Sequence, residues 1–264
     1  MTSLDLSFCQ IRGTIPNTIG QLTSLRELSL YINKLVGPIP YTISSLSKLE
    51  TFDIGFNSLT GAIPSVIGSM TSLTYLDLSN SPLGGTIPSA LSALTLLRRL
   101  ILDGNRLSGS IPISLGNLLS LDYLTLSFND LTGPIPNTIS ALTKLRILGI
   151  AFSSLTGTIP SSISRLTALT EMSFFRCSLS GTIPPTMSAL TSLRAVDLRS
   201  NYLTMGSSTS VPTSTFSSTT LYGLLRMEDN CFVFSTDSPY PSRSFTATHC
   251  RPTSKYHQCN YVII

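Results

Sequence analysis

The sequence is poor in charge and in the side chains that most catalytic sites need. Only 11% of its 264 residues are charged, it has no tryptophan and it has two histidines, whereas about a quarter of the residues are charged in typical domains. The net charge of +4 is thinly spread, and Arg98 and Arg99 are adjacent but isolated. A nucleic-acid-binding surface needs a basic stripe, so we expect no nucleic acid among the partners.

Long apolar runs are also missing. The mean hydropathy is +0.30, yet no apolar run approaches the roughly 18 residues that a membrane-spanning helix needs. We therefore expect no membrane span in this chain. Serine and threonine, 75 residues together, supply the polar surface in place of charge. No Asn-x-Ser/Thr sequon occurs, so a glycoprotein of this sequence would carry O-linked sugar.

No set of residues for catalysis or for a cofactor can be assembled. The two histidines, His249 and His257, lie near the C-terminus, away from any Ser-His-Asp set on the body of the chain. Neither a phosphate-binding loop nor a dinucleotide fingerprint is present. The histidines and Cys231, Cys250 and Cys259 do not have zinc-finger spacing. We predict a protein that is not an enzyme and that has neither a metal nor a cofactor.

What the sequence does contain is a 24-residue repeat. Its clearest copy, residues 121–136, reads Leu-x-x-Leu-x-Leu-x-x-Asn-x-Leu-x-Gly-x-Ile-Pro. The Ile-Pro pair returns every 24 residues without insertion or deletion, with its proline at Pro16, Pro40, Pro64, Pro88, Pro112, Pro136, Pro160 and Pro184. Positions within the repeat are numbered here from 1 to 24, so that position 1 falls at residues 1, 25, 49 and so on.

The alternating leucines at positions 4 and 6 predict a short strand with one buried face. One such strand cannot bury that face alone, but coils stacked about 4.8 Å apart make a parallel sheet over one continuous core. The proline removes a donor and fixes φ, which forbids a long helix after it. Short 3₁₀ or turn segments are therefore expected on the side opposite the sheet.

Position 9 is an asparagine in most copies. An asparagine inside such a turn can hydrogen-bond backbone groups of its own coil and of the neighbouring coil. The predicted structural residues are Asn33, Asn57, Asn105, Asn129, Asn201 and Asn230. Cys9, Ser81, Ser153 and Cys177 replace the asparagine in the other copies. We expect Cys9 and Cys177 to be buried thiols.

On these residues the chain resembles the plant-type leucine-rich repeat family, whose consensus is LxxLxLxxNxLxGxIPxxLxxLxxL. The resemblance implies an α/β solenoid, a right-handed superhelix with a concave parallel β-sheet and short 3₁₀ turns on the convex side. The family includes receptor-kinase ectodomains, receptor-like proteins and polygalacturonase inhibitors, and it usually binds partners on the concave face. It is mostly extracellular, which implies an extracellular or cell-surface location. Because Met1 stands inside a coil with no signal peptide before it, we expect a fragment of a longer protein.

The repeat divides the chain into three parts. Residues 1–203 hold eight complete coils and a ninth strand. Residues 204–232 hold a Ser/Thr-rich insertion and an irregular tenth repeat, in which Leu225 takes position 4. Residues 233–264 are the expected C-terminal cap or tail, since a terminal coil has no neighbour to cover its core.

Three cysteines cluster near the C-terminus and leave one over if two of them pair. A disulfide between Cys231 and Cys250 would tie the last turn to the tail and would imply an oxidising compartment. The rival pairing is Cys250 with Cys259.

The candidate partner-binding residues flank the inward leucines on the concave face. Aromatic residues grouped on an open sheet suit a protein, peptide or glycan partner. Tyr75 and Tyr123 at position 3 are the strongest candidates, whereas the phenylalanines at position 8 equally fit structural spacers along the edge of the ladder. The full candidate set is Tyr31, Asp53, Phe56, Tyr75, Asp77, Arg99, Tyr123, Phe128, Phe152 and Phe175.

Carboxylates recur at position 5, and two of them fall on adjacent coils. Asp53 and Asp77 should lie about 5 Å apart, the separation of a retaining glycosidase pair. The sheet is open, however, and no apolar pocket is evident that would raise the pKa of one carboxyl. We expect these carboxylates to flank Arg99 or to bind basic groups of a partner.

Threonines also recur after the glycine of the repeat, at Thr14, Thr86, Thr158 and Thr182. A flat threonine array suits an ice surface. The same position holds Pro38, Ala62, Ser110 and Pro134 in other coils. These interruptions favour ordinary solvation of that surface.

Two functions fit the sequence. The first is a non-enzymatic extracellular recognition scaffold that binds a protein, peptide or glycan through the concave face. The alternative is a structural protein whose solenoids stack end to end into a fibre or surface layer. It is motivated by the uncapped first coil, whose exposed edge strand would template self-association.

Overall fold

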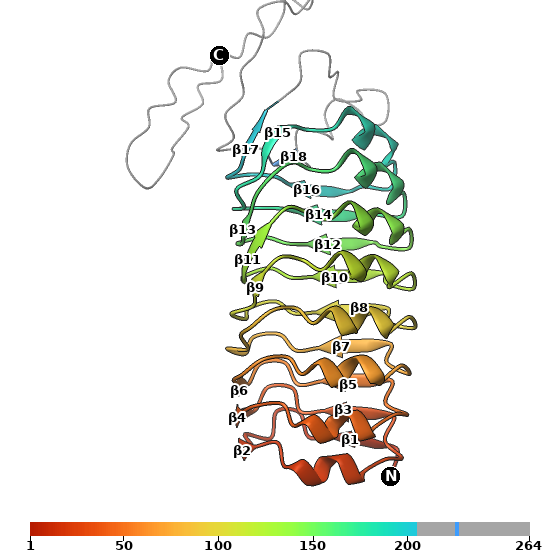
Figure 1. Cartoon of the computed structure of the whole chain (residues 1–264), viewed down its shortest axis with the longest axis vertical. Coiled ribbons are helices and arrows are strands. Elements are labelled where there is room, and N and C mark those ends of the chain that lie inside the picture. The colour runs from red at the N-terminus through yellow and green to blue at the C-terminus, as the bar shows by residue number, and fades with distance from the viewer. Residues whose placement is uncertain (205–224, 227–264) are drawn as a thin grey trace, which may run out of the picture.

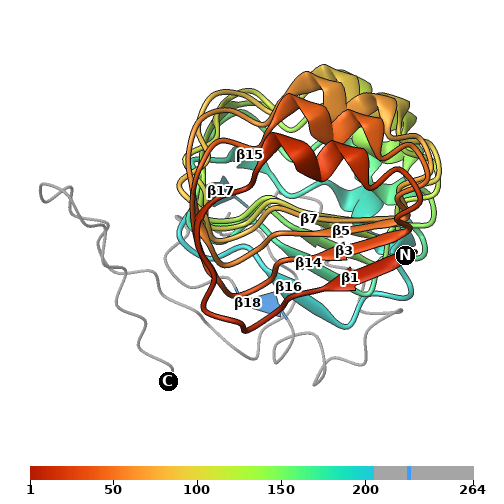
Figure 2. The ribbon, with the colours of Figure 1, turned by 90° about the horizontal axis from the view of Figure 1, so that it is seen from below.

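The computed structural model describes residues 1–204 and 225–226, which form one curved solenoid (Figure 1). Viewed along the solenoid, successive coils superpose, with the main sheet and the 3₁₀ turns on opposite sides (Figure 2). Asn230, the expected disulfide between Cys231 and Cys250, and the expected cap at 233–264 lie outside the described residues.

The main sheet has ten parallel strands in the order β1-β3-β5-β7-β8-β10-β12-β14-β16-β18. They are β1 (Ser3–Asp5), β3 (Glu27–Ser29), β5 (Thr51–Asp53), β7 (Tyr75–Asp77), β8 (Arg99–Ile101), β10 (Tyr123–Thr125), β12 (Ile147–Gly149), β14 (Glu171–Ser173), β16 (Ala195–Asp197) and β18 (Leu225–Arg226). From β1 to β16 each residue pairs with the one 24 positions on, as Leu100 does with Leu124. In β18, Leu225 lies opposite Val196, which is the register that places Leu225 at position 4.

A second row of short parallel strands runs along one flank. They are β2 (Arg12–Thr14), β4 (Lys34–Gly37), β6 (Ser58–Leu59), β9 (Ser108–Gly109), β11 (Asp130–Gly133), β13 (Ser154–Leu155), β15 (Ser180–Thr182) and β17 (Tyr202–Thr204). They form the small sheets β2-β4-β6, β9-β11-β13 and β15-β17. Isolated bridges from Ala62 to Gly84 and from Thr86 to Ser108 continue the pairing through the fourth coil.

Each coil then turns through a five-residue 3₁₀ helix on the side opposite the main sheet. These are η1 (Asn17–Gln21), η2 (Tyr41–Ser45), η3 (Ser65–Ser69), η4 (Ser89–Ala93), η5 (Ile113–Asn117), η6 (Asn137–Ala141), η7 (Ser161–Arg165) and η8 (Pro185–Ala189). The proline of the Ile-Pro pair precedes each of them with an extended backbone, as Pro112 does with φ −61° and ψ 131°. Its fixed φ suits that place, where a missing N–H costs nothing.

One continuous core fills the space between the sheet and the turns. Leu100, Leu124 and Leu148 stack as a column at position 4 and are no more than 1% exposed. Burying a leucine contributes about 1.5–3 kcal/mol, and the leucine and isoleucine columns repeat this gain in every coil. The high hydropathy of the sequence therefore comes from the regular interior.

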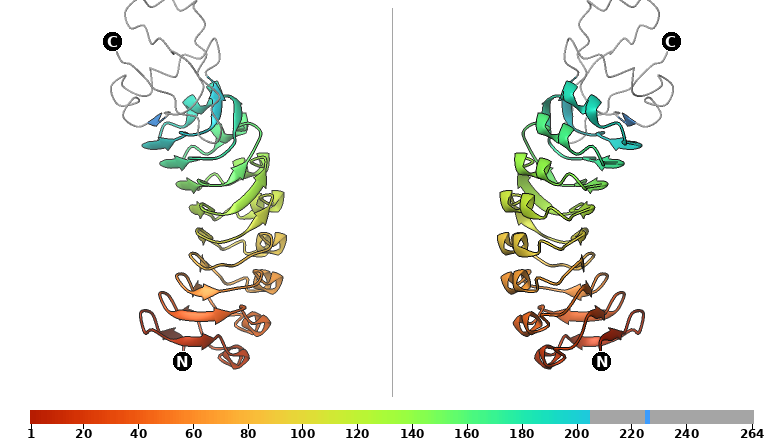
Figure 3. Two further views of the ribbon diagram at one scale, coloured as in Figure 1. Left: turned by 90° about the vertical axis from the view of Figure 1, so that its left-hand side faces the viewer. Right: turned by 90° about the vertical axis from the view of Figure 1, so that its right-hand side faces the viewer.

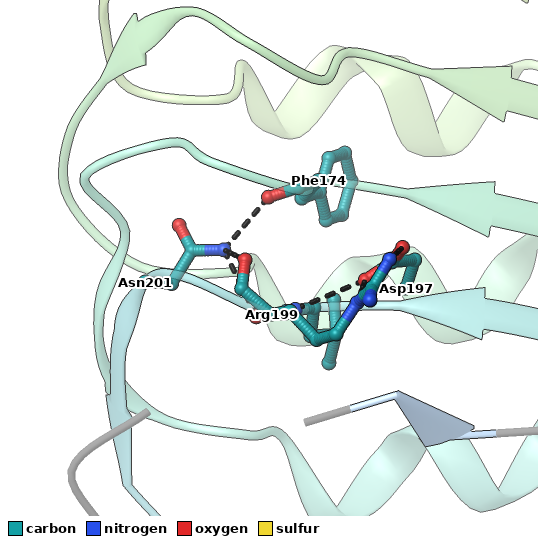
Figure 4. Close-up of polar contacts among 5 residues, drawn as sticks. Phe174, Asp197, Arg199 and Asn201 are labelled. Atoms are coloured by element: carbon teal, nitrogen blue, oxygen red, sulfur yellow. Dashed lines mark hydrogen bonds and ion pairs between the residues drawn. The ribbon is translucent and has the colours of Figure 1, made fainter. Parts of the chain in front are cut away.

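The asparagines at position 9 tie neighbouring coils together. The Asn129 side-chain amide donates to the carbonyl oxygens of Leu126 in its own coil (3.0 Å) and Leu102 in the coil before (2.9 Å). Its Oδ1 accepts from the backbone N–H of Leu107 at 3.0 Å. Figure 4 shows the equivalent Asn201, which reaches back to the carbonyl oxygen of Phe174 at 2.7 Å. The predicted ladder is thus present at the asparagines that the structure describes.

Two replacements at position 9 behave differently from one another. Cys177 is buried as predicted, and its thiol donates to the carbonyl oxygen of Ile150 at 3.0 Å. The expectation for Cys9 is wrong, because Cys9 is exposed. Within the described chain no coil precedes the first one, so nothing covers its position 9.

Side views show the main sheet on the concave side and the 3₁₀ turns on the convex side (Figure 3). Because the leucines at positions 4 and 6 point into the core, the side chains at positions 3, 5 and 7 project from the sheet toward the concave side.

Candidate partner-binding face

The concave face is built around backbone N–H groups that the sheet leaves unpaired. Ladder bonds use the N–H groups of positions 6 and 8, as in Leu126 to Gly149 and Phe128 to Ala151, and pass over position 7. In six of the nine described coils a side chain bonds that position-7 N–H instead. Asp77 Oδ1, for example, accepts from the N–H of Ser79 at 2.8 Å.

Three carboxylates on neighbouring coils form what we call the acidic centre: Asp53, Asp77 and Asp103. Asp53 and Asp77 are directly paired across β5 and β7. Asp53 Oδ1 accepts from the N–H of Gly55 at 3.2 Å. Asp103 stands at position 7 and reaches the next coil, where its Oδ1 accepts from the N–H of Ser127 at 2.6 Å. In each residue one carboxyl oxygen is therefore held by the backbone.

Burial disfavours the charged form of all three carboxylates. Burial and the nearby charge of Asp77 raise the pKa of Asp53 to about 6. Burial also raises the pKa of Asp77 and of Asp103, against the opposing effect of their hydrogen bonds. The sequence shows no apolar pocket that would raise a carboxyl pKa here. The structure corrects that expectation, because burial of these side chains on the sheet raises the pKa of all three.

Tyrosines surround the acidic centre. The Tyr75 hydroxyl donates to Asp77 Oδ2 at 3.4 Å, and burial together with the charges of Asp77 and Asp53 raises the pKa of Tyr75. Burial also raises the pKa of Tyr31, with the same two carboxylates adding to it, and the pKa of Tyr123. Each tyrosine is thus a neutral hydrogen-bond donor at ordinary pH.

Arg99 lies at the edge of this group. Its Nε is 3.9 Å from Asp122 Oδ1, and its guanidinium lies 6.0 Å from the centroid of the Tyr123 ring. Arg98 binds the same Asp122 carboxylate at 3.0 Å. The structure therefore pairs Arg99 with Asp122, at position 2 of the next coil. Within the described residues Arg99 forms no ion pair with Asp53 or Asp77.

Apart from Tyr75 and Tyr123, the candidate aromatic residues fall into two groups. Tyr31 makes edge contacts with Phe8 and Phe56, with centroids 5.6 and 5.4 Å apart. The second group is the aromatic patch: Phe128, Phe152 and Phe175, with a stacked pair at 4.2 Å and an edge contact at 4.9 Å. Asn80 and Gly104 occupy position 8 in the coils between the groups.

The backbone at position 8 is left-handed in every coil from the first to the ninth. Asn80 and Gly104 adopt this conformation readily, whereas Phe56 (φ 54°) and Phe128 (φ 57°) do so against their preference. Phe56 and Phe128 are also 45% and 54% exposed. Bulky, exposed residues in a strained conformation accumulate at functional sites, although the edge contacts equally fit spacers along the ladder.

The structure adds residues that the sequence argument missed. Asp103 belongs to the acidic centre, Thr125 and Ser127 border it, and Arg176 lies 5.5 Å from the centroid of Phe152 in the aromatic patch. The available signal was the strand period itself. Position 7 shares the concave face with position 5, so the same alternation that picks out Asp53 and Asp77 also picks out Asp103.

Within the described part of the chain, no group of three or more histidine, cysteine or acidic residues is arranged to hold a metal ion. Over the same residues, no helix is long and apolar enough to cross a membrane.

The chain matches known repeat proteins in sequence and in structure. The family described as leucine rich repeat matches residues 1–22, 24–83, 47–107 and 120–142. A comparison with curated protein sequences finds no significant match.

Among solved structures, two plant receptors are similar. One is the ectodomain of the Arabidopsis thaliana membrane receptor kinase GASSHO1/SCHENGEN3 in complex with CASPARIAN STRIP INTEGRITY FACTOR 2. It is 35% identical with a TM-score of 0.80, over 88% of this chain and 27% of that one. The other is the ectodomain of the Arabidopsis receptor kinase HAESA in complex with an IDA peptide hormone ligand. It is 33% identical with a TM-score of 0.78, over 88% of this chain and 38% of that one.

A plant ice-binding protein is a third similar structure. It is 26% identical with a TM-score of 0.60, and the match covers 90% of this chain and 84% of that one. The chain thus spans well under half the length of the two receptor ectodomains, and most of the length of the ice-binding protein. Repeat, fold and family match agree: the chain belongs to the leucine-rich repeat proteins, and its 24-residue repeat is of the plant type.

Proposed function

We propose that this chain is a non-enzymatic recognition module that binds a peptide, or an extended segment of a protein, on its concave face. The observation that carries the proposal is the surface of Tyr75, Tyr123 and the acidic centre, which projects from a rigid sheet on the concave side. Tyrosines that offer both an apolar ring and a polar tip are enriched where proteins bind one another. A glycan is the second ligand class that this surface suits.

The similar receptor ectodomains support this proposal, since one was determined in complex with CASPARIAN STRIP INTEGRITY FACTOR 2 and the other with an IDA peptide hormone ligand. They also support an extracellular or cell-surface location, because they are the outer parts of membrane receptor kinases. End-to-end stacking through the edge strand β1 is the alternative, and the similar structures give it no support.

A phage-displayed library of random dodecapeptides tests the proposal. Peptides selected on the wild-type chain would be synthesised, and their affinities measured for a Tyr75→Ala/Tyr123→Ala variant. We expect a loss of about tenfold or more, because aromatic anchors dominate such interfaces. The matched control is Tyr41→Ala in η2, which removes an exposed tyrosine on the convex side. Equal affinity for all three proteins would contradict the proposal.

Ice binding is a second candidate function. Exposed hydroxyls repeat along the flank strands at position 12, at Thr60, Ser108, Thr132, Thr156 and Ser180. Gly84 interrupts this column after Thr60, but from Ser108 to Ser180 it is continuous, and its neighbours there stand about 4.8 Å apart. The similar plant ice-binding protein, matched over 84% of its length, supports the idea.

Inhibition of ice recrystallisation tests this candidate. The wild-type chain should slow crystal growth, and Thr132→Lys/Thr156→Lys should abolish the effect because two long charged chains break the flat array. Thr143→Lys, an exposed threonine beyond η6, is the control. A wild-type chain that leaves crystal growth unchanged removes the candidate.

A further inference from the structure

We propose that the acidic centre receives the guanidinium of an arginine in the peptide bound on the concave face. This inference rests on the recognition function proposed above and names the chemical class of the ligand. The acidic centre groups the carboxylates of Asp53, Asp77 and Asp103 on three neighbouring coils.

The first observation is the missing counter-charge. Asp77 is only 6% exposed, yet within the described residues none of the three carboxylates forms an ion pair. Buried charges in proteins are normally paired, because removing a carboxylate from water is costly. The raised pKa values of Asp53, Asp77 and Asp103 agree with that cost. A cation supplied by a ligand would offset the cost of removing these carboxylates from water.

The second observation is an ion pair that the chain itself makes in the ninth coil. Asp197 also stands at position 5 and bonds the position-7 N–H of its own coil. Its carboxylate is met by the guanidinium of Arg199, with Nε 2.9 Å from Oδ1 and Nη2 2.7 Å from Oδ2 (Figure 4). A position-5 carboxylate on this sheet therefore accepts a two-point guanidinium contact. In the third and fourth coils position 7 holds Gly55 and Ser79, which supply no cation.

The third observation is unused hydrogen-bonding capacity beside the carboxylates. A Cβ at Gly55 would lie 2.9 Å from Asp77 Oδ1, so the glycine lets the Asp77 carboxylate lie close against the third coil. Thr125 is 8% exposed, and its Oγ1 has no hydrogen-bond partner of ordinary geometry within the described residues. It lies beside Asp103, close enough to lower the pKa of that carboxyl, and can accept an N–H from a ligand.

The tyrosines favour an organic cation over a metal ion. Tyr75 and Tyr123 lie on strands β7 and β10, on either side of the coil that carries Asp103, and aromatic faces attract guanidinium groups. A calcium ion takes six to eight oxygen ligands, whereas each carboxylate here has one oxygen held by a backbone N–H.

The aromatic patch adds a second requirement on the ligand. Gly149 and Ala151 leave the seventh coil without a polar side chain on the concave face, next to Phe152. This coil lies two strands from Asp103, or about 10 Å. An extended peptide covers that distance in about three residues. A bound peptide should therefore carry an apolar residue about three places from its arginine.

Arginine and citrulline, its uncharged analogue of nearly the same shape, provide the sharpest test. Each arginine of the peptides selected on the wild-type chain would be replaced in turn by citrulline, and the affinity for the full chain measured. At one position we expect the replacement to weaken binding about tenfold or more.

Asp77→Asn and Asp103→Asn should reduce that difference to about twofold or less. Asparagine keeps an oxygen for the backbone N–H, so these variants should fold. Asp130→Asn, an exposed aspartate on the flank strand β11, should leave the difference unchanged.

The outcomes separate this inference from the proposed function. Selected peptides without arginine, or an arginine preference that survives in both acidic-centre variants, would overturn the inference. The concave recognition site would still stand if those peptides lost affinity for the Tyr75→Ala/Tyr123→Ala variant. Binding of calcium ions by the acidic centre, measured by calorimetry on the wild-type chain and abolished in Asp77→Asn, would also overturn it. If no peptide depends on any concave residue, both proposals fail.

Discussion

A single asparagine connects two coils in this repeat. Asn129 satisfies the carbonyl oxygens of Leu102 and Leu126 and the N–H of Leu107, and it is 6% exposed. Water cannot take over these bonds without entering the core. Asn129 therefore stabilises the fold mainly because, without it, these buried backbone groups would have no hydrogen-bond partner.

Asn129→Ala should lower the free energy of unfolding by about 2–4 kcal/mol, because several buried polar groups lose their partner together. Ser153→Ala provides the control at an equivalent position, where the existing contacts are weak, with Ser153 Oγ 3.5 Å from the Ile150 carbonyl oxygen. We expect about 1 kcal/mol or less there. Urea denaturation followed by circular dichroism measures both, and equal midpoints for the two variants would contradict the assigned role.

Asp53 should make stability depend on pH in the direction opposite to that of most carboxylates. Its pKa is about 6 in the folded chain, against 3.8 as the ordinary value. The folded state thus binds an extra proton between about pH 4 and 6, and stability falls as pH rises through that range. Asp53→Asn should raise the urea midpoint at about pH 7.5 and leave it unchanged at about pH 3.5. A variant that is less stable at the higher pH would show that the carboxylate is favourably held.

At the scale of elements, the spacing between 3₁₀ turns depends on glycine. A Cβ at Gly116 in η5 would lie 2.5 Å from the carbonyl oxygen of Thr138 in η6. Gly116→Ala should therefore destabilise the chain by about 1–3 kcal/mol through overpacking. At Gly84 the nearest heavy atom to an added Cβ is 4.0 Å away, so Gly84→Ala should be neutral or slightly stabilising. Thermal unfolding of both variants checks this, and a neutral Gly116→Ala would mean that the turns can separate.

Most of the elements could be predicted from the sequence because their cause is local and repeated. Leu-x-Leu alternation predicts the strands, and the proline predicts where each 3₁₀ turn begins. The acidic centre was harder to predict, since Asp103 bonds the N–H of Ser127 in the next coil, a contact that no single repeat contains. The exposure of Cys9 likewise follows from its place in the first described coil. Both the hydrogen bond of Asp103 and the exposure of Cys9 depend on which coils lie next to the residue.

At the scale of the whole molecule, stability should be close to a sum over coils and the contacts between adjacent coils. Deleting residues 25–48, one complete coil, keeps every later strand in register. We expect this variant to fold, with a lower urea midpoint and an unchanged shape of its circular dichroism spectrum. Deleting residues 25–47 instead leaves one extra residue, Lys48, before the coil that begins at Leu49. A one-residue shift of β5 against β1 would turn Phe52 and Ile54 away from the core. That variant should unfold at much lower urea, and similar midpoints for the two deletions would argue against the additive description.

The uniform length of the coils also has an evolutionary consequence. Recombination between two copies of the repeat removes or adds whole coils, and the remaining coils keep their register. Duplication of the sixth coil, for example, would lengthen the distance from Asp103 to Phe152 by one coil, with Asp103 still beside a Ser127 and Phe152 still beside a Phe128. Concave faces of different length could arise in this way while each repeat keeps its contacts.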